Sequence, residues 1–294
     1  MAAAGTVRTV DVDGVAVRLS NLDKVLYPDG FTKGEVIDYY SRIAPVLLPH
    51  LTARPCTFVR FPNGVGGGSF FTKNAPKGTP DWVRTVRLPA PGSTQNRDEI
   101  DYVIVDDLAT LVWAANLAAL EMHVPQWRVG PRGGAQAADL VVVDLDPGAP
   151  ATIVECCRLA VQIRDELGET AVAKTSGSKG LQVYARWPGG DSRNAMRDLA
   201  RRLEQASPEL VVSRMAKELR PGKVLLDWSQ NNPAKTTIAP YSLRGRDRPT
   251  VSTPLTWEEV RGCQSPADLV FTATDVLPRM QQFGDLFAPL LDRT

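Results

Sequence analysis

The chain has 294 residues, 43% of them hydrophobic and 23% charged, so it can bury a large core and is too apolar to be a disordered chain. Its 34 lysines and arginines balance 33 acidic residues, which excludes a uniformly basic surface but leaves room for a local basic groove. Two histidines exclude a multi-histidine metal site, and four cysteines show neither CxxC spacing nor the density of a disulfide scaffold.

Neither a membrane anchor nor a secretory signal is expected. No apolar run reaches the ~18–20 residues of a membrane span. The start, MAAAGTVRTVDVDG, lacks a basic segment followed by a long apolar stretch. Together with the few cysteines, these features predict a cytoplasmic protein whose thiols stay reduced.

The first predicted helix begins at a capping box formed by Thr32 and Glu35. Apolar residues follow at helical spacing at positions 36, 40, 43 and 47, and Pro45 should kink or end the helix. A stretch rich in Gly and Pro over 62–80 predicts a loop. Strands are expected over 82–88 and 100–105.

A very apolar segment over 108–122 predicts a buried helix, capped by Asp106 or Asp107. His123 then closes this helix. A hydrogen-bonded core histidine is the default interpretation, and a role in a substrate pocket is the alternative. His50, at the end of the first helix, is interpreted as structural.

The second half of the chain predicts a strand over 139–146 and a helix from about 151 to 167 that ends at Gly168. Segments 171–175 and 181–187 flank a Ser- and Gly-rich tip and predict a hairpin. A helix around 196–203, strands over 223–228 and 236–243, and helices near 256–261 and 274–283 follow.

This mixture lacks strict βαβ alternation, so it favours an α+β fold over a doubly wound sheet. No linker divides the chain. We therefore expect one domain over 1–294, with an N-terminal sub-domain of about 1–100 packed against a catalytic portion of about 101–294.

Two aspartates end the predicted strand over 139–146. Asp144 and Asp146 are two positions apart, so on a strand they point to the same side and lie close together. Two ionised carboxylates at that separation repel unless a proton or a cation lies between them, and Mg²⁺ and Mn²⁺ prefer such oxygen ligands. A surface turn that happens to contain two aspartates is the alternative.

Asp227 follows two leucines and precedes a tryptophan, so it should be buried and needs a partner. Joined to Asp144 and Asp146, it would complete a three-carboxylate site for two metal ions that promote in-line attack on a phosphate. Hydrogen bonds to neighbouring amides would satisfy it equally well, and the sequence does not show whether these carboxylates meet.

Two further segments have the composition of phosphate and nucleic-acid contacts. The tip from Ser176 to Gly180 contains backbone donors, hydroxyls and Lys179, which suit an anion, although most such hairpins are only turns. In the 62–80 loop, Phe70 and Phe71 precede Lys73, a combination suited to base stacking with phosphate contact. Burial of both phenylalanines in the core is the alternative.

Taken in order, the segments resemble one family. They are NLDKVLYP, RFPNG with FF-x-K, ALEMHVPQW, VVVDLDPG, TSGSKG and LLDWSQNN-x-AKTTIAPYSLRGR, and they extend from about Asn21 to the C-terminal helices. The chain resembles the primase-polymerase domain of bacterial ligase D, within the archaeo-eukaryotic primase superfamily. It looks like a stand-alone actinobacterial member, since no ligase or nuclease module accompanies these motifs.

The resemblance implies a template-directed nucleotidyltransferase that adds nucleotides, preferentially ribonucleotides, to a primer 3′-hydroxyl with two Mn²⁺ or Mg²⁺ ions. Metal ligands and catalytic groups would be Asp144, Asp146 and Asp227. Nucleotide contacts would be His123, Ser176, Lys179, Gln230, Lys235 and Arg244. The pocket for the 5′-phosphate of the downstream strand would be Asn21, Lys24 and Lys33. Template and DNA contacts would be Phe70, Phe71, Lys73 and Arg220, the last in a mobile loop.

The implied partners are gapped or broken DNA with a 5′-phosphate, NTP or dNTP, a separate ATP-dependent ligase and Ku, in a nucleoid-associated, cytoplasmic setting without a membrane. Two positions depart from the family pattern: Gln182 replaces a histidine, and Val59 replaces a basic residue. Triphosphate contacts should therefore differ from those of relatives. The alternatives are a haloacid-dehalogenase-type phosphatase, which also ends a strand in Asp-x-Asp, and a nucleic-acid-binding module without catalysis.

Overall fold

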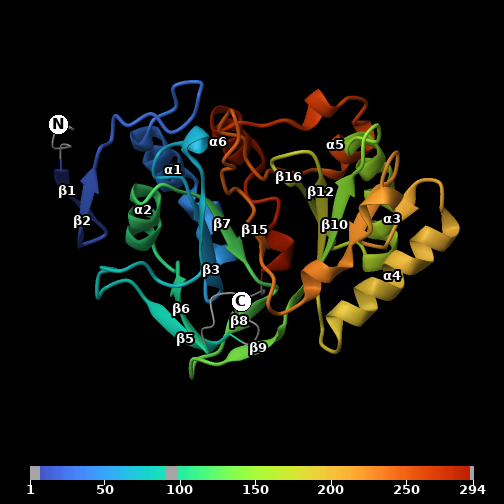
Figure 1. Ribbon diagram of the computed structural model, residues 1–294, viewed down its shortest axis with the longest axis horizontal. Coiled ribbons are helices and arrows are strands. Elements are labelled where there is room, and N and C mark those ends of the chain that lie inside the picture. The colour runs from blue at the N-terminus through green and yellow to red at the C-terminus, as the bar shows by residue number, and fades with distance from the viewer. Residues whose placement is uncertain (1–6, 91–97, 292–294) are drawn as a thin grey trace.

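Two β-sheets lie side by side in the computed structural model, which describes residues 7–90 and 98–291 (Figure 1). The first sheet has the strand order β15-β7-β3-β6-β5, with β4 added beside β3. Its strands are β3 (Pro55–Arg60), β4 (Phe70–Thr72), β5 (Thr85–Pro89), β6 (Glu99–Ile104), β7 (Ala119–Val124) and β15 (Thr237–Ile238). Helices α1 (Lys33–Leu51) and α2 (Leu108–Asn116) share a hydrophobic core with this sheet.

The second sheet has the order β13-β14-β10-β12-β11-β16. Its strands are β10 (Leu140–Pro147), β11 (Val172–Thr175), β12 (Leu181–Arg186), β13 (Val211–Val212), β14 (Val224–Asp227) and β16 (Pro254–Leu255). Helices α3 (Ile153–Leu167), α4 (Ser192–Ala206) and α5 (Trp257–Gly262) contribute to the core beside it. Figure 1 shows these helices on the outer side of β10 and β12, away from the first sheet.

The remaining elements are short or peripheral. Strands β1 (Val7–Val12) and β2 (Val15–Ser20) form a hairpin, and β8 (Trp127–Val129) pairs with β9 (Ala135–Ala138). Helix α6 (Ala273–Phe283) packs against α1. The 3₁₀ helices are η1 (Val65–Gly67), η2 (Lys217–Leu219), η3 (Trp228–Asn231), η4 (Pro266–Leu269) and η5 (Ala288–Leu290).

The period of two along β10 explains how this strand presents its aspartates. Val141, Val143 and Leu145 are buried in the core that contains α3 and α4. Residues between them point to the opposite face, which is the face that carries Asp144 and Asp146. Burial of three aliphatic side chains on one face therefore fixes both carboxylates on the other.

Several sequence predictions are confirmed, including the α+β class. Thr32 forms the predicted capping box with Glu35, and Asp107, not Asp106, caps α2 through the Thr110 amide. The hairpin is confirmed, since β11 pairs antiparallel with β12 from Val172 opposite Tyr184 to Thr175 opposite Leu181. All four cysteines are free and buried.

Two predictions about single elements are wrong. The helix over 108–122 ends at Asn116, and after Ala118 (φ 56°) the chain continues as β7, so His123 lies on a strand. A short apolar run has no periodicity that separates a buried helix from a buried strand. The strand over 236–243 is reduced to Thr237–Ile238. Helix α1 continues past Pro45 to Leu51, so of the two effects predicted for this proline, the end of the helix is excluded and the kink stays a prediction.

The division at about residue 100 stays a prediction, as does the single domain over 1–294. The first sheet takes its strands from both sides of that position, because β7 and β15 follow it in the chain. Residues 1–6, which begin the segment where no secretory signal is expected, lie outside the described part. Among the described residues, the helices are all too short or too polar to span a bilayer.

Candidate functional site

A row of four side chains crosses the second sheet at one level. Asp144 on β10 lies directly opposite Asp227 on β14 and, on its other side, opposite Gln182 on β12. Gln182 lies opposite Lys174 on β11. Opposed residues of neighbouring strands point to the same face. Across the sheet, the order of these side chains is therefore Asp227, Asp144, Gln182 and Lys174.

Asp144 and Asp146 both line one open cavity. Burial, and then the charges of Asp146 and Asp227, raise the pKa of Asp144 to about 7. The Gln182 amide opposes this effect by donating to Asp144 Oδ1 over 3.0 Å. The predicted convergence of the two carboxylates is thus present, and their negative charge is only partly compensated.

Asp227 is opposite Asp144, but its carboxylate is engaged by its own neighbours. The backbone N–H of Ser229 donates to Oδ1 over 3.0 Å, and the Ser229 hydroxyl donates to the same oxygen. Gln230 Nε2 donates to Oδ2 over 2.8 Å. The Lys235 ammonium lies 4.0 Å from Oδ2. Within the described ranges, no three acidic, imidazole or thiol side chains converge closely enough to hold a metal ion in this conformation.

The hairpin tip after β11 lies against the cavity, with Ser176, Ser178 and Lys179 in its lining. Ser176 Oγ accepts from the backbone N–H of Ser178 and Gly180 over 3.3 and 3.1 Å. A Cβ on Gly180 would lie 2.5 Å from the carbonyl oxygen of Leu145. Only glycine allows the tip to approach the aspartate-bearing strand this closely.

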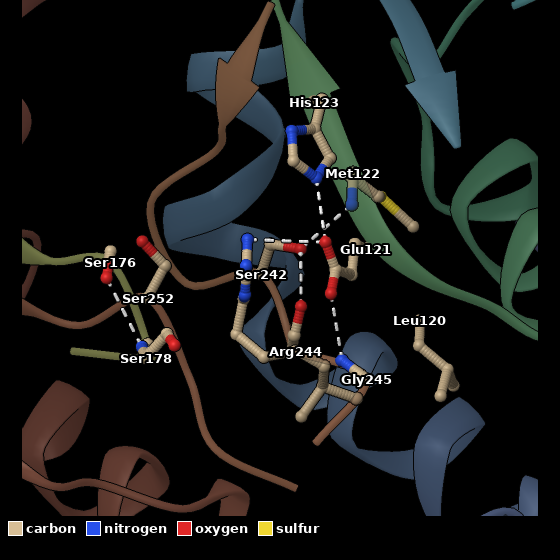
Figure 2. Close-up of polar contacts among 12 residues, drawn as sticks. Leu120, Glu121, Met122, His123, Ser176, Ser178, Ser242, Arg244, Gly245 and Ser252 are labelled. Carbon is tan, nitrogen blue, oxygen red and sulfur yellow. Dashed lines mark hydrogen bonds and ion pairs between the residues drawn. The ribbon is translucent and has the colours of Figure 1, made fainter. Parts of the chain in front are cut away.

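Glu121 on β7 organises the opposite wall of the cavity. Its Oε2 accepts from His123 Nε2 over 2.9 Å and pairs with Arg244 Nη1 over 3.2 Å, while Oε1 accepts from the Gly245 amide over 3.0 Å. Figure 2 shows His123 and Arg244 reaching this one carboxylate from different directions. Burial alone would raise the pKa of Glu121, but these three contacts outweigh burial and lower it. His123 and Arg244 also line the cavity.

Two more predicted nucleotide contacts lie near Asp227. Gln230 lines the cavity and bonds to the Asp227 carboxylate. Lys235 donates to Ser229 Oγ over 2.5 Å and is half-buried at the rim. Arg220 lies on the neighbouring loop, whose backbone packs tightly against the segment that follows β10: a Cβ on Gly148 would lie 2.2 Å from the Arg220 carbonyl oxygen.

Phe70 and Phe71 are 60% and 57% exposed, so burial of both in the core is excluded. They lie on β4, a short strand within the predicted loop, which pairs with β3. The Phe71 ring meets the His123 ring edge-on at 6.2 Å between centroids, which connects the aromatic pair to the cavity. Lys73 reaches the Ala234 carbonyl oxygen over 3.5 Å.

Asn21, Lys24 and Lys33 form a separate cluster before and at the start of α1. The Lys33 amide donates to the Lys24 carbonyl oxygen over 2.8 Å, and the Lys24 amide to that of Asn21 over 3.1 Å. The Lys33 side chain is buried and reaches Ser20 Oγ over 3.4 Å. Burial, and then the charge of Lys24, lower the pKa of Lys33 to about 8. Two neighbouring amines at a helix N-terminus favour a bound anion.

The sequence reasoning missed Glu121, Lys174 and Arg246, of which the last lines the cavity. The signal for Glu121 was present, because Glu121 and His123 share one face of a strand through their spacing of two. The helix prediction hid that signal. Carboxylates, cations and backbone donors around one cavity are typical of proteins that act on phosphoryl or nucleotidyl groups.

Comparison with known proteins agrees with this class. The family model described as "LigD, primase-polymerase domain" matches residues 32–287. The chain therefore belongs to the LigD primase-polymerase domain family. The haloacid-dehalogenase alternative is thereby set aside.

The relatives include the "Multifunctional non-homologous end joining protein LigD" of Mycolicibacterium smegmatis, which is 46% identical over 282 residues, or 93% of this chain and 36% of the relative. The "Bifunctional non-homologous end joining protein LigD" of Bacillus subtilis is 32% identical over 277 residues, or 91% of this chain and 43% of the relative. The chain thus spans well under half the length of either.

A solved structure, "Polymerase Domain from Mycobacterium tuberculosis Ligase D in complex with DNA", is similar with a TM-score of 0.86 and 41% identity. The match covers 93% of this chain and 97% of that one.

The raised pKa of Asp144 predicts a stability penalty at neutral pH. The folded chain retains a proton that the unfolded chain releases above about pH 4, so without divalent metal stability falls as the pH rises toward the folded value of about 7. Asp144→Asn removes this penalty and keeps the oxygen that accepts from Gln182. We expect the metal-free variant to melt about 2–4 °C above the wild type at neutral pH, by calorimetry.

The same comparison at about pH 4 should show almost no difference, because the wild-type carboxyl is then protonated in the folded state. Asp165→Asn, at an exposed position of α3, is the control and should leave the melting temperature unchanged at both pH values. Equal melting of wild type and Asp144→Asn at neutral pH would contradict the buried-charge assignment.

Proposed function

We propose that this chain is a template-dependent DNA-repair primase-polymerase that adds nucleotides, ribonucleotides by preference, to a primer 3′-hydroxyl at short gaps or breaks. One observation carries the proposal: Asp144, Asp146, the Ser176–Gly180 tip, and the His123 and Arg244 side chains held by Glu121 surround one cavity in a chain of the LigD primase-polymerase family. The reaction class is that of a nucleotidyltransferase.

The carboxylates fit hard divalent ions. Asp144, Asp146 and Asp227 are oxygen donors, and the raised pKa of Asp144 reports negative charge that a cation would compensate. Bound Mn²⁺ or Mg²⁺ would supply Lewis-acid stabilisation of the α-phosphate and a lowered pKa for the primer 3′-hydroxyl. The protein orients its ligands through Gln182 on one side of the row and through Ser229 and Gln230 on the other.

The nucleotide triphosphate is held by donors that converge from three segments. They are Ser176 and Lys179 of the hairpin tip, Gln230 and Lys235 beside Asp227, and Arg244 with His123 on the Glu121 wall. Among these residues, only Arg244 carries a planar guanidinium group, which can donate two parallel hydrogen bonds to two phosphate oxygens. Its ion pair with Glu121 pre-orients it before the nucleotide binds.

DNA is held beside the cavity, at the edge formed by β4. Phe70 and Phe71 provide exposed rings for stacking on template bases, with Lys73 and Arg220 as backbone contacts. The similar solved structure contains DNA, which supports this assignment. The curated relatives are named for non-homologous end joining. We therefore assign the chain to end joining, with gap filling in excision repair as the second pathway.

The protein partners would be an ATP-dependent DNA ligase and Ku. The protein would act at the bacterial nucleoid.

The central test is primer extension on a labelled, gapped duplex with Mn²⁺ and NTPs. The wild type should extend the primer. Asp144→Ala should abolish extension and leave DNA binding largely intact, because affinity for DNA comes mainly from cations and stacking. Asp165→Ala is the matched control at an exposed position.

Two other outcomes of these assays would favour a different function. Phosphate release from model esters without extension would favour a phosphatase. A gel shift with neither activity would favour the nucleic-acid-binding module. A higher catalytic efficiency with dNTPs than with NTPs would contradict only the ribonucleotide preference.

The Asn21–Lys24–Lys33 cluster predicts recognition of a terminal 5′-phosphate. Such a phosphate carries nearly two charges at neutral pH, against one for an internal phosphodiester. Charge-assisted contacts of about 1.5–3 kcal/mol each predict at least roughly tenfold tighter binding of a gap with a 5′-phosphate than of one with a 5′-hydroxyl. Lys24→Ala/Lys33→Ala should lose this preference in a fluorescence titration.

The preference should also weaken as the pH rises above about 8, because Lys33 with its lowered pKa then loses its proton. A wild type that is indifferent to the phosphate at pH 7 would refute the pocket.

The exposed rings predict a loss of DNA affinity without a loss of folding. Phe70→Ala and Phe71→Ala should each cost ~1–3 kcal/mol of binding to gapped DNA, measured by anisotropy. Phe283→Ala on α6, where the ring is 40% exposed, is the control and should bind as the wild type does. A fall in the melting temperature of the Phe70 or Phe71 variant, with affinity unchanged, would show that the rings stabilise the fold instead.

A further inference from the structure

Lys174 is a buried amine that meets an amide and a hydroxyl rather than a carboxylate. Its side chain is fully buried on β11. Nζ lies 2.5 Å from Gln182 Oε1 and 2.6 Å from Ser252 Oγ, and 5.5 Å from the centre of the Tyr184 ring. Burying an amine of this kind is costly, and an apolar side chain of similar length would avoid the cost. The presence of a buried lysine at this position therefore requires an explanation.

The contact with Lys174 determines which way the Gln182 amide points. Lys174 Nζ donates to Gln182 Oε1, so the amide oxygen is the atom that faces the amine. The NH₂ group is then directed to the other side, where it donates to Asp144 Oδ1 over 3.0 Å. A flipped amide would place N–H against the amine and C=O against the carboxylate, so both contacts would become repulsive.

A second donor supports the same orientation. The Tyr184 hydroxyl reaches Gln182 Oε1 over 3.3 Å and is itself bonded to Thr237 Oγ1 at 2.8 Å. Gln126 Nε2 donates to Thr237 Oγ1 over 2.7 Å. These groups are all buried. A buried, fully connected network of this kind holds one arrangement much more strongly than a single hydrogen bond does.

We propose that Lys174 and Gln182 are positioning residues of the nucleotidyl-transfer site: Lys174 orients the Gln182 amide, and the amide holds Asp144 in the conformation that binds metal. Neither side chain needs to touch the nucleotide for this role. The inference rests on the proposed function, because it assigns Asp144 to a divalent-metal site. It also gives Gln182, where the family pattern has histidine, a task that depends on Lys174.

The test compares Lys174→Met, Gln182→Leu and the double variant. Groups that orient a metal ligand typically contribute about 10–100-fold to metal affinity or activity. Each single variant should therefore weaken Mn²⁺ binding by about tenfold or more, measured from the free Mn²⁺ signal in electron paramagnetic resonance. We expect kcat for extension to fall in parallel, while KM for the NTP changes by less than roughly threefold.

The double variant decides whether the two residues act together. If Lys174 acts only through the Gln182 amide, the double variant should bind Mn²⁺ no more weakly than the weaker single variant. Effects that multiply would overturn the proposal, since they would show that Lys174 acts independently of Gln182. Unchanged Mn²⁺ affinity in Gln182→Leu would overturn it as well.

Two further variants separate positioning from folding. Lys174→Gln keeps an N–H donor for Gln182 without the amine and should recover Mn²⁺ affinity to within roughly threefold of the wild type. If Lys174→Gln lost as much Mn²⁺ affinity as Lys174→Met, that result would contradict the proposal. Thr110→Val, a buried change in α2 at a hydroxyl without a hydrogen-bond partner, should alter neither Mn²⁺ affinity nor kcat.

Asp144→Ala distinguishes this inference from the function on which it rests. A wild type and an Asp144→Ala variant that bind Mn²⁺ equally would refute the metal site itself. Mn²⁺ binding that is lost in Asp144→Ala and retained in both Lys174→Met and Gln182→Leu would refute only the positioning role.

Discussion

The opposition of Asp144 and Asp227 on neighbouring antiparallel strands is the constraint on which the site depends. Like charges in directly opposed positions destabilise a sheet, and Asp146 adds a third negative charge. The surrounding groups offset this cost only in part: Gln182 donates to one carboxylate, and Ser229 and Gln230 donate to the other. This uncompensated charge is the reason for proposing that the three carboxylates bind a divalent cation.

The two sheets contribute different polar groups to one cavity. The second sheet supplies the carboxylates from β10, and the first supplies His123 from β7, while Arg244 approaches from the segment after β15. Glu121 makes this wall possible, because it neutralises Arg244 and orients His123 with a single carboxylate. In the proposed function, the carboxylates would hold the metal ions, and Arg244 and His123 would contact the triphosphate.

Features encoded over a few residues could be predicted from the sequence. The capping box at Thr32, the aspartate-bearing strand and the Ser176–Gly180 hairpin depend on local spacing, and all three are confirmed. The opposition of Asp144 and Asp227 could not be predicted, because strand register joins segments some 80 residues apart through the packing of the whole sheet. Glu121 could not be identified because its segment was predicted to be a helix. In a helix, residues two positions apart do not share a face, whereas on strand β7 Glu121 and His123 do.

Strand β3 links the proposed DNA contacts to the reacting end of the site. It pairs with β4, placing Val59 opposite Phe71, and with β7, placing Thr57 opposite His123. The residues just after β3 accept from Lys24 Nζ, at the Pro62 carbonyl oxygen over 2.5 Å. One hydrogen-bonded segment thus connects Phe71, His123 and Lys24, the residues proposed to contact the template, the nucleotide and the downstream 5′-phosphate. We therefore propose that the protein backbone sets the distance between primer terminus and downstream phosphate, which would favour gaps of a few nucleotides over long single-stranded regions.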